Sequence, residues 1–242
     1  PPTDLVAGKD GRVVNRGGCG AKVPGFKLSC TSSTDQVCTG TDTPGLTNIS
    51  GTTTNTSKRK LFTEPNTFTN GSVNTMLDLN ADVATAGTLQ TSLGAGSVGT
   101  CSSSDAVSPP SACYLLKYAR GLLNDGTTKR SWLFGDVLHS RPVAINYGTK
   151  GVYIAAGSNN GFMHMVRDAD GVEAWGFMPR AVMPKLATLA AGSATTPVHP
   201  YLVDGAPTQY IYDANGDGNI GAGDKVYLYF GLRRGGTSYY AL

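Results

Sequence analysis

The 242-residue chain has few charged residues, only 15%, and its net charge is only +3. Lys and Arg are scattered, and the one basic run, "SKRK" at residues 57–60, reads as a solvated loop. A nucleic-acid-binding protein concentrates its basic residues on one surface, often beside an aromatic platform. The sequence therefore excludes a polybasic nucleic-acid-binding protein.

The common sequence signatures of catalysis are also missing. The sequence has no G-x-S-x-G nucleophile motif and no phosphate-binding P-loop. Its three histidines, His139, His164 and His199, are far apart and lack metal-ligand spacing. We interpret each as a hydrogen-bonded structural histidine and predict that the protein is not an enzyme. No run reaches the roughly 18 apolar residues that a membrane-spanning helix needs.

The five cysteines show no C-x-x-C spacing, which argues against a zinc or redox site. Disulfides formed in an oxidising compartment are the better interpretation. Cys30–Cys38 and Cys101–Cys113 are plausible local pairs that leave Cys19 over, although spacing alone does not decide the connectivity. The chain begins "PPTDL" and stops at "TSYYAL". We therefore expect a processed or partial chain, in which Cys19 has its partner elsewhere.

What the chain has in plenty is glycine, with 32 residues, together with 13 prolines and many Thr, Ser and Asn. Residues 1–112 are poor in large apolar side chains and predict an irregular β/loop region with disulfides. Within them we expect a strand at 59–63 and a helical turn at 73–83. Apolar residues at helical spacing predict a helix within 112–123, which Gly121 would end. A second region, 113–242, begins with this helix.

From residue 131 the pattern is mainly β. Short runs of β-branched and aromatic residues alternate with turns such as "GSNNG", which predicts a meander like a propeller blade or small barrel. "PRAVMPKLATLAAG" interrupts it as a short helix with Pro184 at the first helical position. We expect 225–232 to pair with a strand of a partner or of a missing part of the chain. The predicted strands are 152–156, 162–168, 172–179, 208–213 and 225–232.

The stretch "DANGDGNIGAGD", residues 213–224, matches the template of a twelve-residue calcium loop. Gly218 stands at position 6, where the turn is sharp, and Gly221 at position 9 leaves room for a water. Calcium takes six to eight oxygen ligands in flexible geometry, whereas magnesium needs a smaller octahedral site. Because a strand precedes the loop, it is EF-hand-like without the helices. The predicted metal ligands are Asp213, Asn215, Asp217, Asn219 (through its carbonyl) and Asp224.

The alternative is an Asn- and Asp-rich hairpin loop that binds no metal. A second acidic stretch, "RDADGVE" with Asp168 and Asp170, is too short for a loop of this kind, and we interpret it as a turn.

Residues from about 113 onward resemble the C-terminal β-propeller of PilY/PilC-type type IV pilus proteins. The resemblance lies in a G-D-x-x-H-S-x-P segment, a Tyr-to-His strand pair around the "SNNG" turn, a helix with two prolines and an H-x-Y-x-x-D-G-x-P segment. The family often has Asp-Gly where this turn has Asn-Gly. The first 110 residues match only loosely. The matching residues are Gly135, Asp136, His139, Ser140, Pro142, Tyr153, Asn159, Gly161, His164, Pro179, Pro184, His199, Tyr201, Asp204, Gly205 and Pro207.

The resemblance implies a fimbrial protein of the bacterial surface, exported through the periplasm and outer membrane to the pilus tip. It implies roles in pilus biogenesis, adhesion to host or abiotic surfaces, and calcium-regulated extension and retraction, which drive twitching motility. Minor pilins are the implied partners. The implied fold is mainly β, with about two opening blades of a partial propeller whose remainder lies outside these residues. The RGD loop of some relatives is absent from this sequence.

Two other classes remain open at this point. The run "VYIAAGSNNGFMHMVRDADG" also resembles blades of quinoprotein dehydrogenases, which are propeller enzymes that carry pyrroloquinoline quinone. Those enzymes gather calcium ligands from distant blades, whereas the loop here is one sequential set. The third class is a structural surface module in which calcium only staples the fold.

Overall fold

The computed structural model describes residues 5–6, 13–14, 59–67, 74–79, 83–96, 101–126, 130, 134–191 and 200–242. The chain forms two compact units, each made of several segments. Unit 1 contains Pro1–Lys60, Leu79–Thr91 and Ala95–Phe134, and unit 2 contains Leu61–Asp78, Ser92–Gly94 and Gly135–Leu242. The sequence division into 1–112 and 113–242 is a different one and stays a prediction.

Two helices account for most of the regular structure described in unit 1. Helix α2 (Val83–Leu93) ends just inside unit 2, and α3 is Ala112–Arg120. The Ser111 hydroxyl accepts the N–H of Tyr114 at the start of α3, and Gly121 ends it with φ 90°. These are the expected devices, because a side-chain acceptor satisfies a free N–H and glycine tolerates left-handed backbone. The predicted helix and its end at Gly121 are confirmed. Two short strands, β1 (Leu5–Val6) and β2 (Val13–Val14), pair antiparallel.

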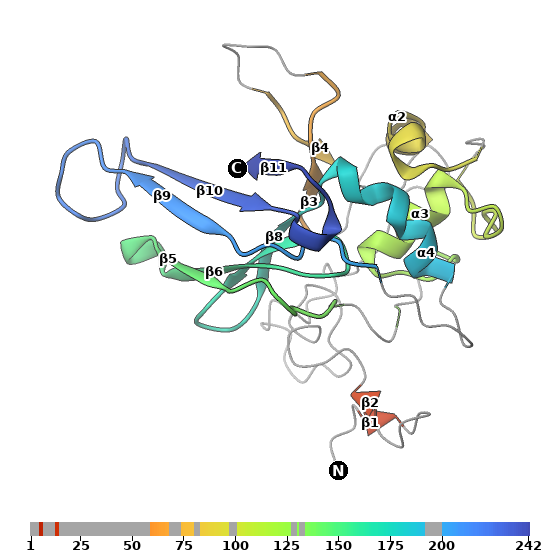
Figure 1. Ribbon diagram of the computed structural model, residues 1–242, viewed down its shortest axis with the longest axis horizontal. Coiled ribbons are helices and arrows are strands. Elements are labelled where there is room, and N and C mark those ends of the chain that lie inside the picture. The colour runs from red at the N-terminus through yellow and green to blue at the C-terminus, as the bar shows by residue number, and fades with distance from the viewer. Residues whose placement is uncertain are drawn as a thin grey trace, which may run out of the picture. The chain divides into compact units, whose positions relative to one another are not determined.

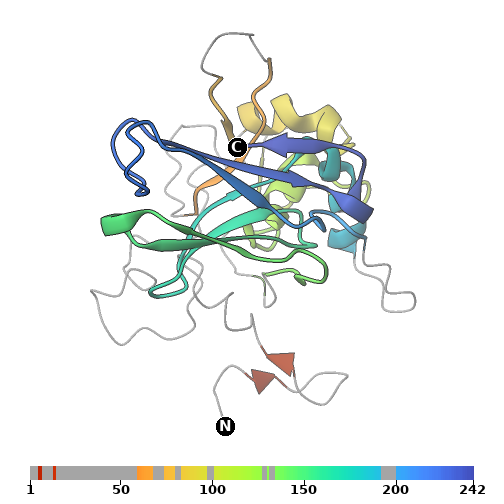
Figure 2. The same ribbon diagram turned by 60° about the vertical axis from the view of Figure 1, so that its left-hand side comes forward.

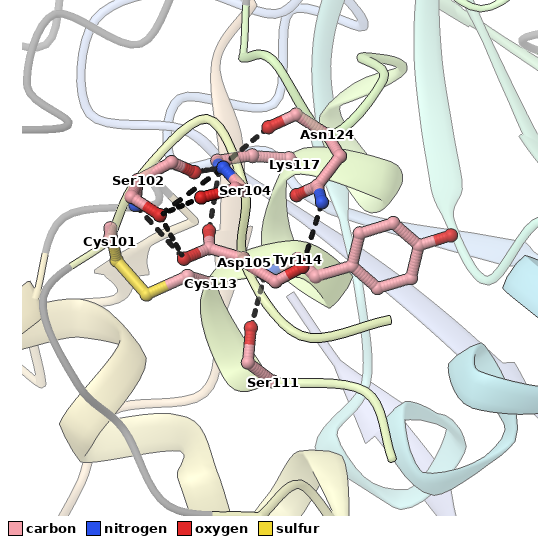
Figure 3. The surroundings of a disulfide bond; sticks show 9 residues. All are labelled: Cys101, Ser102, Ser104, Asp105, Ser111, Cys113, Tyr114, Lys117 and Asn124. Carbon is pink, nitrogen blue, oxygen red and sulfur yellow. Dashed lines mark hydrogen bonds and ion pairs between the residues drawn. A yellow bond between two sulfur atoms is a disulfide. The ribbon is translucent and has the colours of Figure 1, made fainter. Parts of the chain in front are cut away.

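A buried lysine in the last turn of α3 holds the helix to its surroundings (Figure 3). The Lys117 side chain is fully buried, and its Nζ lies 2.6 Å from Asp105 Oδ2. Nζ also donates to the carbonyls of Ser102 and Asn124. A buried ammonium group is tolerated only when its charge and its donors are all matched, as they are here.

The Cys101–Cys113 disulfide lies beside this lysine and is the predicted pair (Figure 3). Cys19, Cys30 and Cys38 lie outside the described residues. Two buried arginines add a second polar cluster in unit 1: Arg59 Nη1 donates to the Arg120 carbonyl at 3.0 Å, and Arg120 Nη2 returns a bond to the Arg59 carbonyl at 3.2 Å. Arg120 also donates to the Leu79 carbonyl.

Unit 2 is built on a six-stranded sheet in the order β4-β3-β8-β7-β6-β5 (Figures 1 and 2). Strands β5 to β8 form an antiparallel meander, as predicted, and β3 pairs parallel with β8. Apolar side chains such as Ile145, Met163 and Phe177 are buried on it. The bounds are β3 Leu61–Thr63, β4 Leu77–Asp78, β5 Val143–Asn146, β6 Val152–Gly157, β7 Met163–Arg167 and β8 Glu173–Phe177.

A second sheet of unit 2 has three strands in the order β11-β10-β9. They are β9 (Thr208–Tyr212), β10 (Lys225–Gly231) and β11 (Tyr239–Ala241), all antiparallel. The expectation that 225–232 pairs with a strand from outside is wrong, because β10 already has a neighbour on each edge. Short 3₁₀ turns follow β5 (η1, Gly148–Lys150) and β10 (η3, Arg233–Gly235).

Two helical predictions need correction. The predicted helical turn at 73–83 contains β4 instead, because pairing with β3 at Phe62–Asp78 supplies hydrogen bonds that outweigh local preference. Pro184 lies inside a 3₁₀ helix, η2 (Arg180–Lys185), and not at the start of an α-helix. The α-helix that follows, α4, is Leu186–Ala191.

The described residues therefore show a mainly β fold with two larger sheets and short helices, and no closed propeller appears among them. The four-stranded meander is compatible with a blade, but the partial propeller stays a prediction. Within the same residues, no helix is both long enough and apolar enough to cross a bilayer.

Replacing Lys117 by Met is expected to destabilise unit 1 by about 3–5 kcal/mol, because Asp105 would keep a buried, unpaired charge. Hydrogen exchange of the α3 amides measures the effect locally. Lys150→Met is the matched control, since Lys150 is exposed. Protection of α3 equal to that of the control would contradict the structural role of the Lys117–Asp105 pair.

Candidate functional site

The five predicted calcium ligands all lie in the loop that joins β9 to β10 (Figure 1). The pair Tyr212–Lys225 is the last of the ladder, so the hairpin closes immediately around residues 213–224. The loop is mostly exposed, and Gly216, Gly218 and Gly223 have φ of 72°, 75° and 94°. These glycines permit the left-handed turns that fold the loop back on itself.

The first and last carboxylates of the loop accept backbone N–H groups. Asp213 accepts from Gly218 and Gly216, both at 2.7 Å, and from Asn215 at 3.3 Å. These bonds, that of Gly218 foremost, hold the pKa of the Asp213 carboxyl below its usual value, since they favour the charged form. Asp224 accepts from Gly221 at 2.6 Å and from Ala214 at 2.8 Å. Both ends of the loop are thus ordered by carboxylates.

The three middle residues form a chain of contacts. Asn215 Nδ2 donates to Asp217 Oδ2 at 2.9 Å, and the N–H of Asn219 donates to Asp217 Oδ1 at 2.7 Å. The Asp217 N–H in turn donates to Asn215 Oδ1 at 3.1 Å. The Asn219 side chain also donates from Nδ2 to the Asp217 carbonyl at 3.2 Å, so the middle of the loop is held by bonds among its own exposed residues.

The atoms that this loop offers as metal ligands are all oxygens. Oxygen ligands are what a hard cation such as calcium prefers, so the residues fit that metal by type. The structure does not gather their side chains into a ready cage: among the described residues, no group of three or more His, Cys, Asp or Glu side chains is close enough to hold a metal ion. Calcium binding at this loop therefore remains a prediction.

The family-motif residues form a buried network elsewhere in unit 2. Asn159, at the turn after β6, donates from Nδ2 to Asp136 at 2.8 Å and accepts the N–H of Leu202 at 3.0 Å. Ser140 Oγ accepts the N–H of Gly157 at 2.8 Å. The motif segments are therefore in contact because their polar side chains satisfy each other's backbone. Sequence alone showed the motifs but not these partners.

Close backbone packing explains several motif glycines. A Cβ at Gly205 would lie 1.9 Å from the Gly231 carbonyl oxygen, and one at Gly135 would lie 2.3 Å from the Asn160 nitrogen. Contacts under 3.0 Å force the backbone to shift, so only glycine fits here.

Two of the three histidines bind buried carboxylates, as predicted for structural histidines. His139 Nδ1 donates to Asp204 at 2.8 Å, and Arg233 Nη1 donates to the same carboxylate at 3.2 Å. The Asp204 side chain is fully buried. His199 lies outside the described residues.

His164 forms a serine–histidine–carboxylate arrangement that the sequence did not reveal. Its Nδ1 lies 2.8 Å from Glu173 Oε1, and its Nε2 lies 2.9 Å from Ser158 Oγ. The residues come from the β6–β7 turn, β7 and β8, so only strand pairing brings them together. Ser158 and His164 have no exposed surface, so in this conformation a substrate does not reach the hydroxyl. The group is a buried hydrogen-bond network.

The stretch 167–173 forms a turn between β7 and β8. Asp170 pairs with Arg167 and accepts the N–H of Val172 at 3.1 Å, so its carboxylate closes the turn. This agrees with the interpretation of that stretch as a turn.

Replacing Asn159 by Ala is expected to cost about 1–3 kcal/mol, because the buried N–H of Leu202 would lose its acceptor. Urea unfolding in a Trp132→Phe background, followed by the fluorescence of Trp175 in unit 2, measures this. Asn146→Ala, at an exposed position, is the control and should change stability by less than about 0.5 kcal/mol. Equal stabilities of the two variants would show that the network does not hold unit 2 together.

No protein-family model and no solved structure matches the chain. Curated proteins do match. The type IV pilus biogenesis factor PilY1 of Pseudomonas aeruginosa strain UCBPP-PA14 is 31% identical over 126 residues, covering 42% of this chain and 11% of that protein. PilY1 of strains PAO1 and PAK is 27% identical over 143 residues, covering 49% of this chain and 12% of each.

The matched segment is thus about half of this chain and about a tenth of the relatives. The matches agree with the family that the motifs indicated. Over about half its length, this chain is similar to the PilY-type family of type IV pilus biogenesis factors, and the resemblance is confirmed.

Proposed function

We propose that the chain is part of a calcium-binding protein of the type IV pilus tip, which acts in pilus biogenesis, surface adhesion and control of pilus extension and retraction. Similarity to biogenesis factors over about half the chain supports the pilus role. Pilus association also fits a cell-surface or extracellular location. Minor pilins are the proposed partners, with host or abiotic surfaces as targets of adhesion.

The observation that carries the calcium proposal is the β9–β10 loop. Its five oxygen-bearing residues occupy positions 1, 3, 5, 7 and 12 of one hairpin loop, with Gly218 at position 6. The bond from Gly218 to Asp213 joins position 6 to position 1, which holds the loop in a compact turn. Three carboxylates at one exposed turn repel each other, and a divalent cation removes that repulsion. The ion would be held by Asp213, Asn215, Asp217, the carbonyl of Asn219 and Asp224.

Calcium could act there as a staple or as a switch, and the affinity distinguishes the two. A site that is always full at working calcium levels only stabilises the hairpin. A site of micromolar to millimolar affinity fills and empties as calcium changes, and it can then regulate what the hairpin contacts. We favour the switch, because three carboxylates with an exposed loop resemble the weaker sites of sensors and extracellular modules.

A catalytic role is not part of the proposal. The one arrangement with the right chemistry, Ser158–His164–Glu173, is buried, and its hydroxyl is already engaged by the β6–β7 turn.

Calcium titration of the 242-residue chain by calorimetry is expected to show one site that magnesium does not fill. Asp217→Asn keeps the size of the side chain but removes one charge, and we expect about tenfold weaker calcium binding. Asp168→Asn, in the exposed β7–β8 turn, is the matched control and should bind as the wild type does. Absence of calcium heat in the wild type, or equal binding by both variants, would reject the loop as the site.

Calcium is also expected to stabilise the folded chain. At about a hundred times the dissociation constant, a single native-state site adds about 2.7 kcal/mol, so the melting temperature should rise with calcium. The rise should shrink in Asp217→Asn and persist in Asp168→Asn.

In the cell that produces the protein, Asp217→Asn should change the number of surface pili and the twitching zone. If a variant that no longer binds calcium still makes normal pili, the pilus role does not depend on calcium. Calcium would then only stabilise the hairpin, as in the staple interpretation.

A further inference from the structure

Strand β10, the middle strand of the three-stranded sheet of unit 2, has one buried side and one exposed side. Along β10, Leu228 and Phe230 are buried, while Lys225 and Tyr229 are exposed. Side chains alternate across a strand, so Lys225, Tyr227 and Tyr229 share the exposed side.

Strand register collects further tyrosines on this side. Residues directly opposite in an antiparallel pair point to the same face. Tyr210 is opposite Tyr227, Tyr212 is opposite Lys225, and Tyr239 is opposite Gly231. The ring of Tyr239 lies over Gly231, since a Cβ there would be 2.9 Å from Tyr239 Cε1. We call the resulting set the tyrosine face: Tyr210, Tyr212, Tyr227, Tyr229 and Tyr239.

The tyrosine face is open to solvent to an unusual degree. Tyr210, Tyr212 and Tyr229 are each about half exposed, and Tyr239 is 87% exposed. The Tyr227 ring lies 6.2 Å from that of Tyr210 and 6.4 Å from that of Tyr229, with interplanar angles of 30° and 28°. Three neighbouring rings thus have similar orientation. Contiguous exposed aromatic side chains of this kind are typical of surfaces that contact a ligand, a protein or a membrane.

The charge of this face is one-sided. None of the three strands contains an Asp or Glu, and Lys225 stands at one end of the face. At the other end lies a hollow of about 500 Å³, which is lined by Tyr239 of the tyrosine face and by Gly231 of β10. Arg233 lines it together with the hydroxyl-bearing Thr237 and Ser238.

Arg233 itself is held in an uncommon conformation. Its φ is 51°, the only positive value among the described non-glycine residues, and such strain tends to accumulate at functional sites. One Nη donates to the buried Asp204, which fixes the guanidinium, while 48% of the side chain remains exposed. The remaining N–H groups of a half-exposed guanidinium can bind a carboxylate.

We propose that the tyrosine face and the adjoining hollow bind an acidic oligosaccharide. The C–H face of a sugar ring packs on the negative face of an aromatic ring, and phenol hydroxyls bond to sugar hydroxyls. A row of similarly oriented rings can take successive sugars, and Arg233 takes a carboxylate at the end of the row. The acid lies toward Arg233, because the Asp213–Asp224 loop repels anions at the Lys225 end.

Charge also distinguishes this ligand from a nucleic acid. Single strands carry a phosphate on every unit and need cations along the whole groove. Here Lys225 and Arg233 stand only at the two ends, which suits a ligand with few charges. The site is formed by the sheet and does not need calcium. Only its biological use, in adhesion, rests on the proposed function.

The test is calorimetric titration of the 242-residue chain, in the presence of a calcium chelator, with an acidic hexamer: maltohexaose in which the terminal non-reducing glucose is replaced by glucuronic acid. This hexamer carries one carboxylate at one end. The chelator keeps the result independent of the calcium loop. The double variant Tyr210→Ala/Tyr227→Ala should bind about tenfold more weakly or worse, since two stacking contacts are lost. Tyr147→Ala removes a tyrosine from the β5–η1 region instead and should bind as the wild type does.

Arg233→Gly separates the charge contact from the stacking. Glycine suits a φ of 51°, so the fold should persist, which the melting temperature checks. This variant should lose affinity for the acidic hexamer but bind neutral maltohexaose as the wild type does. The proposal is overturned if the wild type does not bind the acidic hexamer, or if the double tyrosine variant binds it equally well. It is overturned too if single-stranded oligothymidylate binds more tightly and loses that binding in the tyrosine variant.

Discussion

The structure of unit 2 depends on backbone segments packed too closely for side chains and joined by buried polar groups. Asn159 bonds to Asp136 and to the backbone of Leu202, while Gly205 lies directly against Gly231. A buried amide that lost these partners would keep unsatisfied donors and acceptors, so the contacts must form together or not at all. The meander, the segment before it and the three-stranded sheet are held in one arrangement by this requirement.

The same arrangement gives the β9–β10 hairpin its importance. Its second strand, β10, is anchored by Leu228 and Phe230 on the buried side. Its loop is then free to be polar and its outer face to be aromatic, because neither is needed for the core. The proposed calcium loop and most of the proposed sugar-binding face therefore belong to the same hairpin. A cation at Asp213–Asp224 would change the electric field at the Lys225 end of the tyrosine face, since the two adjoin in sequence.

Unit 1 uses charge differently. Lys117, Arg59 and Arg120 are buried, and each donates mainly to backbone carbonyls. Such groups contribute little net stability but penalise any other packing, because a misplaced helix would leave a buried cation without acceptors. The Cys101–Cys113 disulfide adds a covalent restraint at the same place. The described residues around α3 can in this way specify one packing.

Local sequence was sufficient to predict an element where the residues of one short stretch themselves favour that structure. Ser111 and Gly121 bound a helix, alternation in 152–177 forms a meander, and 213–224 forms a compact polar loop of glycines and Asx residues. It failed at Leu77–Asp78, where pairing with β3 overrides helical preference, and at Pro184, where a 3₁₀ turn takes the place of a helix start. The Ser158–His164–Glu173 network and the tyrosine face were invisible to it, because their members meet only through strand register. Residue type and spacing thus indicated most of the elements, offered Cys101–Cys113 as a plausible pair and carried the family resemblance. Tertiary structure alone decided which side chains share a face, since non-local hydrogen bonds between strands set that register.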